Sequence, residues 1–269
     1  MNSTCRLLAT LVGLALAVTM GTPVLAQQSR AQQACINAIN KDAAKVGKAQ
    51  GKANVACVKA GTKGSVTPTC PSDDLKQKVA KEIAKTLSDD IDRCAAEPPN
   101  FAYTSGGGAA IAYRQAELNL LSDVFGSTDL SATISTDKGT GGCQSAVAKD
   151  MEKVAAAASL GFVGCKKDAV SAPAASMNAV QACVGSDERN KVTATAAKLG
   201  SDVGNKCQNV TVSSAFPGLC STSTAATLAD CVAGRVRCRM CQAANNADGL
   251  NAVCDTLDDG VANASCSAN

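Results

Sequence analysis

The sequence has no histidine and no tryptophan, and its 269 residues include only four Phe and two Tyr. Without histidine the chain cannot form a Ser-His-Asp or Cys-His catalytic site, a histidine-ligated zinc site or a CxxCH haem site. Single-stranded nucleic acid is bound largely by aromatic stacking, so the scarcity of aromatic residues argues against it as a partner. We expect a protein that is not an enzyme, with no catalytic residue and no cofactor.

Apolar runs long enough to span a membrane are also absent. The most apolar segment, Leu7 to Met20, follows the positive charge of Arg6 and precedes small residues that suit a cleavage site after Ala26. It is shorter than a transmembrane helix. We therefore predict a signal peptide over residues 1–26, no membrane anchor, and a periplasmic or extracellular mature protein.

Cysteine, in contrast, is abundant. The chain has 15 cysteines, and all but Cys5 follow the expected cleavage site. An even number of cysteines in an exported chain favours disulfides, here seven bridges among the remaining 14. The formal net charge of +3 is nearly neutral for a chain of this length.

The cysteine spacings repeat along the chain. Cys35 to Cys57 and Cys143 to Cys165 are both 22 residues apart, and Cys70 to Cys94 and Cys183 to Cys207 are both 24 residues apart. The connection between the two spacings is 13 residues in the first case and 18 in the second. We interpret the pattern as two copies of one unit that differ in a loop.

Each copy is predicted to begin with an antiparallel helical hairpin. Apolar residues recur at helical spacing in each expected helix. In the first copy they are Cys35, Ile36, Ile39, Ala43, Val46, Ala53 and Cys57, then Leu75, Val79, Ile83, Leu87, Ile91 and Cys94. In the second they are Val147, Met151, Val154, Ala158, Phe162 and Cys165, then Val192, Ala196, Leu199 and Val203.

The second helix of each hairpin has an expected start. Pro71 and Ser72, with Asp73 and Asp74 in the first turn, open it in the first copy, and Ser186, before Asp187 and Glu188, opens it in the second. Cysteines that flank the turn and cysteines at the open end then pair most compactly. The expected pairs are Cys35–Cys94, Cys57–Cys70, Cys143–Cys207 and Cys165–Cys183.

A third helix is predicted to follow each hairpin. It covers residues 109–125 in the first copy, before a polar linker over 127–142, and about 224–246 in the second. Three of the last six cysteines lie on the latter helix and three outside it, so three bridges can tie the tail to the helix, with pairing left open. The six are Cys220, Cys231, Cys238, Cys241, Cys254 and Cys266.

The C-terminal block offers three kinds of candidate site. Cys238 and Cys241 have the CxxC spacing of redox enzymes, but no strand precedes them, which favours structural disulfides. The same two thiols with Cys254 and Cys266 make a candidate zinc site, against which an oxidising compartment argues. Asp255, Asp258 and Asp259 are weak calcium candidates without EF-hand spacing.

Lysines form a stripe on the first expected helix, opposite its apolar face. They are Lys41, Lys45, Lys48, Lys52 and Lys59. Such a face can attract an anionic cell-surface polymer or a phospholipid surface, and the latter gives the alternative of a membrane-active secreted effector. Amphipathic helices normally carry lysine on the solvated side, however, so the stripe is not specific for binding.

The C-terminal block carries a resemblance. The segment from Cys231 to Cys241, then Asn246 to Leu250, then Cys254 to Gly260 and Cys266, resembles a group of bacterial exported cysteine-rich proteins. The resemblance implies export, repeated helices anchored by disulfides and a similar C-terminal block. It implies no activity, catalytic residue or cofactor.

We therefore expect an all-α protein of two tandem disulfide-stapled units, each of about three helices, with a cysteine-rich C-terminal cap. The expected divisions are 1–26 (signal peptide), 27–135 (first unit), 136–215 (second hairpin) and 216–269 (helix and cap). The expected function is that of a non-catalytic structural, adhesive or binding protein, with a surface polymer or another protein as partner. The alternative is a thiol-redox or metal-binding protein that uses the C-terminal cysteines.

Overall fold

A computed structural model describes residues 28–173 and 175–266, and in these residues the regular elements are all α-helices. The prediction of an all-α fold is confirmed. The expected signal peptide lies outside the described residues. The long helices are α1 (Arg30–Gly61), α2 (Lys78–Cys94), α3 (Gly106–Phe125), α4 (Lys138–Ser171), α6 (Lys191–Lys206) and α8 (Leu228–Asp248). The short ones are α5 (Met177–Ser186), α7 (Val212–Ala215) and α9 (Cys254–Asp258).

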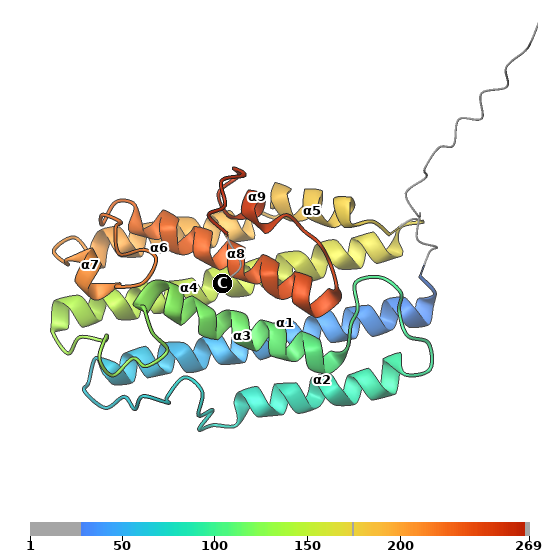
Figure 1. Cartoon of the computed structure of the whole chain (residues 1–269), viewed down its shortest axis with the longest axis horizontal. Helices are drawn as coiled ribbons and strands as arrows, with labels where there is room; N and C mark the ends of the chain where they lie inside the picture. The colour runs from blue at the N-terminus through green and yellow to red at the C-terminus, as the bar shows by residue number, and fades with distance from the viewer. Residues whose placement is uncertain (1–27, 174, 267–269) are drawn as a thin grey trace, which may run out of the picture.

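The long helices run roughly along one direction and form an elongated bundle (Figure 1). α1 packs against α2, α3 and α4, while α4 also packs against α6 and α8, and α3 packs against α8. One hydrophobic core includes Ile39 of α1, Leu120 of α3, Val154 of α4 and Val236 of α8. The segments before and after residue 135 therefore share a core.

Disulfides close both helical hairpins. The structure has the bridges Cys35–Cys94, Cys57–Cys70, Cys143–Cys207 and Cys165–Cys183, which are the pairs that hairpin geometry predicts. In each hairpin the first bridge ties the open end and the second flanks the turn. The four bridges close loops of 13 to 64 residues. On a chain-entropy model, each such bridge restricts the unfolded chain and thereby stabilises the folded state by about 3 to 4 kcal/mol.

The predicted starts of α2 and α6 are wrong by several residues. α2 begins at Lys78, after a turn in which Asp74 and Gln77 have positive φ of 41° and 52°. α6 begins at Lys191, after a turn in which Asp187 and Asn190 have φ of 41° and 50°. Each aspartate caps from outside the helix, because its carboxylate accepts backbone N–H bonds from the first turn.

Three other expectations need correction. The segment 127–142 is not a loose linker, because Leu130 and Ile134 are buried and α4 already begins at Lys138. A helix that the sequence analysis missed, α5, contains Cys183 and ends at Ser186. The apolar stripe of α2 is only partly buried, because α2 lies at the edge of the bundle and leaves Leu87 and Ile91 exposed.

No helix in the described part of the chain is both long and apolar enough to cross a membrane.

Candidate functional site: a groove beside the C-terminal disulfides

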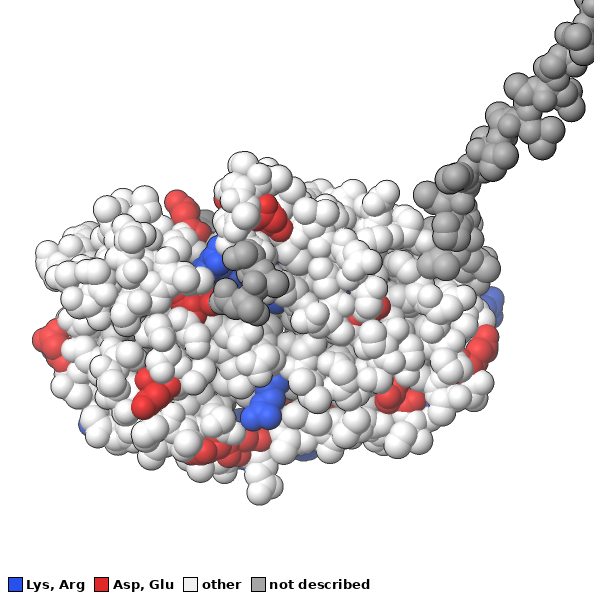
Figure 2. Space-filling view, in the orientation of Figure 1, with Lys and Arg blue, Asp and Glu red and all other residues white. Residues whose placement is uncertain are grey.

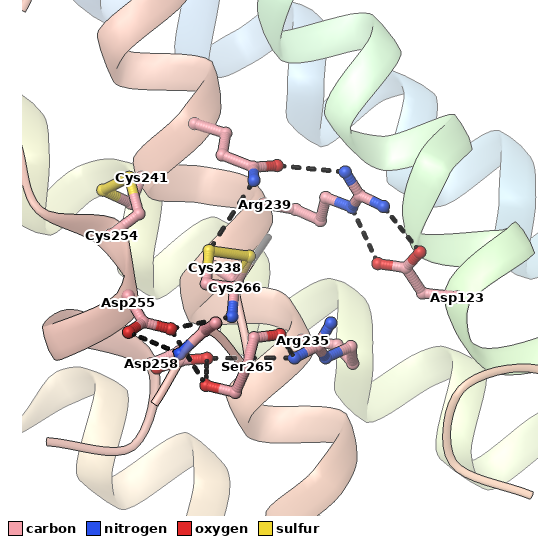
Figure 3. Close-up of a disulfide and its surroundings, with 12 residues drawn as sticks. Asp123, Arg235, Cys238, Arg239, Cys241, Cys254, Asp255, Asp258, Ser265 and Cys266 are labelled. Atoms are coloured by element: carbon pink, nitrogen blue, oxygen red, sulfur yellow. Dashed lines mark hydrogen bonds and ion pairs between the residues drawn. A yellow bond between two sulfur atoms is a disulfide. The ribbon is translucent and has the colours of Figure 1, made fainter. Parts of the chain in front are cut away.

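The C-terminal segment is fixed to α8 by two neighbouring bridges (Figure 3). Cys238 is bonded to Cys266 and Cys241 to Cys254, with Cα–Cα distances of 5.4 Å in both. A third bridge, Cys220–Cys231, ties the chain before α8 to its first turn. Each of the three joins one cysteine of α8 to one outside it. The pairings were left open by the sequence.

These bridges involve the cysteines of both thiol alternatives. Cys238 and Cys241 are not bonded to each other, so the CxxC spacing does not form a redox dithiol here. The four thiols considered for zinc are all consumed by the same two bridges. All 14 cysteines within the described ranges are in disulfides.

The calcium candidates hold the tail in place, and two of them, Asp255 and Asp258, both accept from the Ser265 hydroxyl. Asp255 accepts backbone N–H bonds from Ala264 and Cys266 at 2.8 and 3.1 Å, and these bonds hold its pKa below the ordinary value. Asp258 is buried and accepts a bond from the Ser265 hydroxyl at 2.7 Å. Asp259 accepts the N–H of Val261. Among the described residues no group of three His, Cys, Asp or Glu could hold a metal ion.

Arginines of α8 connect this block to the rest of the bundle (Figure 3). Arg239 donates two hydrogen bonds of 2.7 Å to the Asp123 carboxylate of α3, and both side chains are buried. Arg235 lies 3.8 Å from Asp258, and Arg237 donates to the Asp258 carbonyl oxygen at 3.2 Å. The two hydrogen bonds between Arg239 and Asp123 fix the relative orientation of the two side chains, in addition to the attraction between their charges.

A groove of about 560 Å³ lies beside this block. Its floor is the C-terminal half of α4. One wall is the turn between α5 and α6, the other is the segment from α9 to Gly260, and Arg237 of α8 reaches the groove as well. The apolar lining includes Leu160, Val163, Val184, Val192 and Leu257. The volume suits a small molecule or part of a longer chain.

The floor of this groove includes two glycines, Gly161 and Gly164. A Cβ atom added at Gly161 or Gly164 would meet nothing within 4 Å, so open space lies above both positions. Leu160 is 51% exposed at the same place. Charged side chains of both signs, including Glu188, Arg189 and Lys191, line the groove as well. The groove therefore offers an apolar floor together with charged groups.

One lysine of the α1 stripe is held by an ion pair. Lys45 forms an ion pair with the buried carboxylate of Asp42 at 2.6 Å. Burial raises the pKa of Glu152 on α4, and the nearby charges of Lys52 and Lys48 oppose that shift, which places both lysines next to an acidic neighbour. On the face drawn in Figure 2, basic and acidic side chains are scattered and form no continuous patch of one sign.

Lys41, Lys48, Lys52 and Lys59 are all exposed. In the described part of the chain, the stripe therefore has one ion-paired lysine, Lys45, and four exposed lysines.

Sequence reasoning missed a buried polar cluster elsewhere in the bundle. The Lys166 side chain of α4 has no exposed surface and contacts Asn40 of α1 and Asp248 of α8. The sequence contains an indication of this cluster. Lys166 lies four residues after Phe162 and four before Val170, and therefore on the same helix face as these two buried residues. A lysine on the apolar face of a helix needs a partner in the core.

Comparison with protein-family models, with curated proteins and with solved structures found no match to this chain.

Proposed function

We propose that the protein is an exported, non-catalytic binding protein that holds an amphiphilic ligand with an aliphatic part in the groove beside the C-terminal disulfides. The observation that carries the proposal is the groove itself, with open space over Gly161 and Gly164 on an apolar floor. The aliphatic part of a ligand is stabilised on such a floor because its apolar surface is removed from water. The charged side chains that line the groove can contact the polar head of the same ligand.

Disulfides support a preformed site. Cys165–Cys183 joins the floor to the wall made by α5, and Cys241–Cys254 joins α8 to the start of the opposite wall. Walls that are covalently held lose little conformational freedom when a ligand binds, which lowers the cost of binding. Seven bridges also suit an oxidising compartment, in agreement with the export that residues 1–26 predict.

We further propose that the protein consists of two copies of one unit. The aspartate turn before α2 and the one before α6 stand at equal distances from the preceding cysteines, Cys70 and Cys183. The ion pair of Lys45 with Asp42 also recurs, as Lys153 with Asp150. In this view the groove is a feature of the second copy, where the longer connection forms α5.

The test is binding of a fluorescent fatty acid by the mature, oxidised protein. Gly161→Leu places an aliphatic side chain over the floor, and we expect at least a tenfold loss of affinity, equivalent to about 1.4 kcal/mol. Gly142→Leu is the matched control, because Gly142 is on the same helix, is exposed and has no atom within 4 Å of an added Cβ. Unchanged helical circular dichroism shows that both variants fold.

Two results would contradict the proposal. One is the absence of saturable binding by the wild-type protein, and the other is an equal effect of Gly161→Leu and Gly142→Leu. The thiol-redox or metal-binding alternative has less support, because the four cysteines considered for it are in disulfides.

A further inference from the structure

Three long helices bring polar side chains together in the core at one point. Lys166 of α4, Asn40 of α1 and Asp248 of α8 are each 3% exposed or less. The Lys166 Nζ atom donates a hydrogen bond to Asn40 Oδ1 at 2.8 Å and another to Asp248 Oδ2. One amine is thus in contact with both a carboxamide and a carboxyl group.

The surroundings of the amine are apolar and incompletely hydrogen-bonded. Phe162 and Val170, one turn before and after Lys166, are buried. Asn40 Nδ2 is buried and has no hydrogen-bond partner among the described residues, although an amide usually finds one in a core. Burying an ion pair costs several kcal/mol per ion before the attraction is counted, so stability alone is a poor reason for this arrangement.

The geometry fits a reaction between the amine and the carboxamide. With Nζ 2.8 Å from Oδ1, and a carbonyl bond of about 1.2 Å, Nζ is within about 4 Å of the Asn40 Cγ atom. That distance is close to the separation of about 3 to 3.5 Å from which intramolecular reactions proceed efficiently. A desolvated lysine amine next to a proton acceptor is also an activated nucleophile.

We propose that Lys166 and Asn40 form an intramolecular isopeptide bond, with Asp248 as the group that carries the proton. Asp248 accepts a proton from the Lys166 ammonium, and the neutral amine attacks Asn40 Cγ. As the Cγ–Nδ2 bond breaks, Asp248 gives this proton to the departing nitrogen and takes up the second proton that Nζ loses. The products are one secondary amide between Nζ and Cγ, one ammonia and a protonated Asp248, with no oxidant or reductant required.

The environment of Asp248 suits this role. Burial raises the pKa of Asp248, and the opposing influence of Lys166 does not cancel that effect. Transfer of the proton from Lys166 to Asp248 converts two buried charges into two neutral groups, which a low-dielectric core favours. Asp248 also lines a cavity of about 310 Å³ with Phe101 and Tyr103, a route by which ammonia can leave.

The bond would add a connection that the disulfides lack. Of the seven bridges, two lie within the segment before residue 136 and five within the segment after it, so none joins one to the other. Asn40 and Lys166 lie on opposite sides of that division, on α1 and α4, which pack directly against each other. A bond between them would keep the two segments joined after a cut in the chain between them.

The test is a peptide map of the secreted protein after reduction and alkylation. Trypsin does not cleave after an acylated lysine, so the bond predicts that residues 31–41 are recovered joined to residues 154–167. The joined species has the summed mass of the two peptides less one ammonia. Intact mass alone is insufficient, because Gln27, the expected first residue, also loses ammonia when it cyclises.

Variants assign the reaction to these groups. We expect Asn40→Ala, Lys166→Met and Asp248→Ala to remove the joined peptide. Tyr113→Phe, a change at a buried residue of α3 that interacts with the charge of Asp248, leaves the joined peptide in place. A native disulfide map identifies variants that fold. Recovery of residues 31–41 and 154–166 as separate peptides from folded wild-type protein overturns the proposal, whatever the variants do.

Discussion

Glu117 is a carboxylic acid in the core, where its charged form is disfavoured. It is 3% exposed and lies over Gly51 of α1 together with Glu152 of α4. Burial, with the charge of Glu152 as a second cause, raises the pKa of Glu117 well above 4.5. The folded state therefore binds this proton more tightly than the unfolded state, so the associated stability is complete below the ordinary value and is lost as pH rises through the folded pKa.

We predict that Glu117→Gln removes the loss of stability that the wild-type protein shows as pH rises. The free energy of unfolding of the variant should exceed that of the wild type by about 1 to 3 kcal/mol at pH 8, and by less at pH 4. Urea denaturation at the two pH values, with disulfides intact, measures the difference. Glu97→Gln, a change at an exposed position, is the control. Equal pH dependence of wild type and Glu117→Gln would show that Glu117 is not held protonated.

Residue identity alone indicates some buried groups but not their partners. The helical period places Lys166 between two buried residues of the same face, which is enough to mark it as unusual. Its partners Asn40 and Asp248 are 126 and 82 residues away in the chain. Contacts of that range depend on how helices pack, which periodicity within one helix does not contain.

At the scale of elements, the cysteine spacing predicted the hairpins well, but the acidic residues gave misleading helix starts. Asp73 and Asp74 have the composition of a first helical turn, yet Asp74 has left-handed φ and caps from outside. The Asp187 carboxylate does the same, accepting the N–H groups of Lys191 and Thr193 at 3.1 and 2.8 Å. A sequence shows the residue that suits a helix terminus, but not which side of the terminus it occupies.

We predict that Asp187→Ala destabilises the protein by about 1 to 2 kcal/mol at pH 7, because the cap is lost and alanine is strained at positive φ. Although burial opposes it, hydrogen bonds from the first turn of α6 hold the pKa of Asp187 below its ordinary value. The capping contribution is therefore present above that value and is lost as pH falls through the folded pKa, so the difference should narrow in acid. Thermal unfolding measures it.

Glu188→Ala, a change at the next, exposed residue, is the control for this prediction. A cost for Asp187→Ala no larger than that of Glu188→Ala would remove Asp187 as the cap of α6.

At the scale of the whole molecule, spacing indicated the cysteine pairs within each hairpin but not the packing between segments. Phe125 and Phe216, whose ring centroids are 5.6 Å apart, meet across the predicted division. Gly218 lies so close to α3 that an added Cβ would overlap the Asp123 carbonyl oxygen. Nothing in the repeated spacing predicts these contacts. The groove was missed for the same reason, because its floor and walls come from separate parts of the chain.

The central claim is that an exported chain is held in a helical bundle by seven disulfides. The most direct test is a non-reducing peptide map of the protein recovered from outside the cytoplasm, together with its N-terminal sequence. We predict a chain that begins at Gln27, no free thiol, and bridges that include Cys238–Cys266 and Cys241–Cys254. A retained Met1, free thiols, or a Cys238–Cys241 bridge would contradict this account.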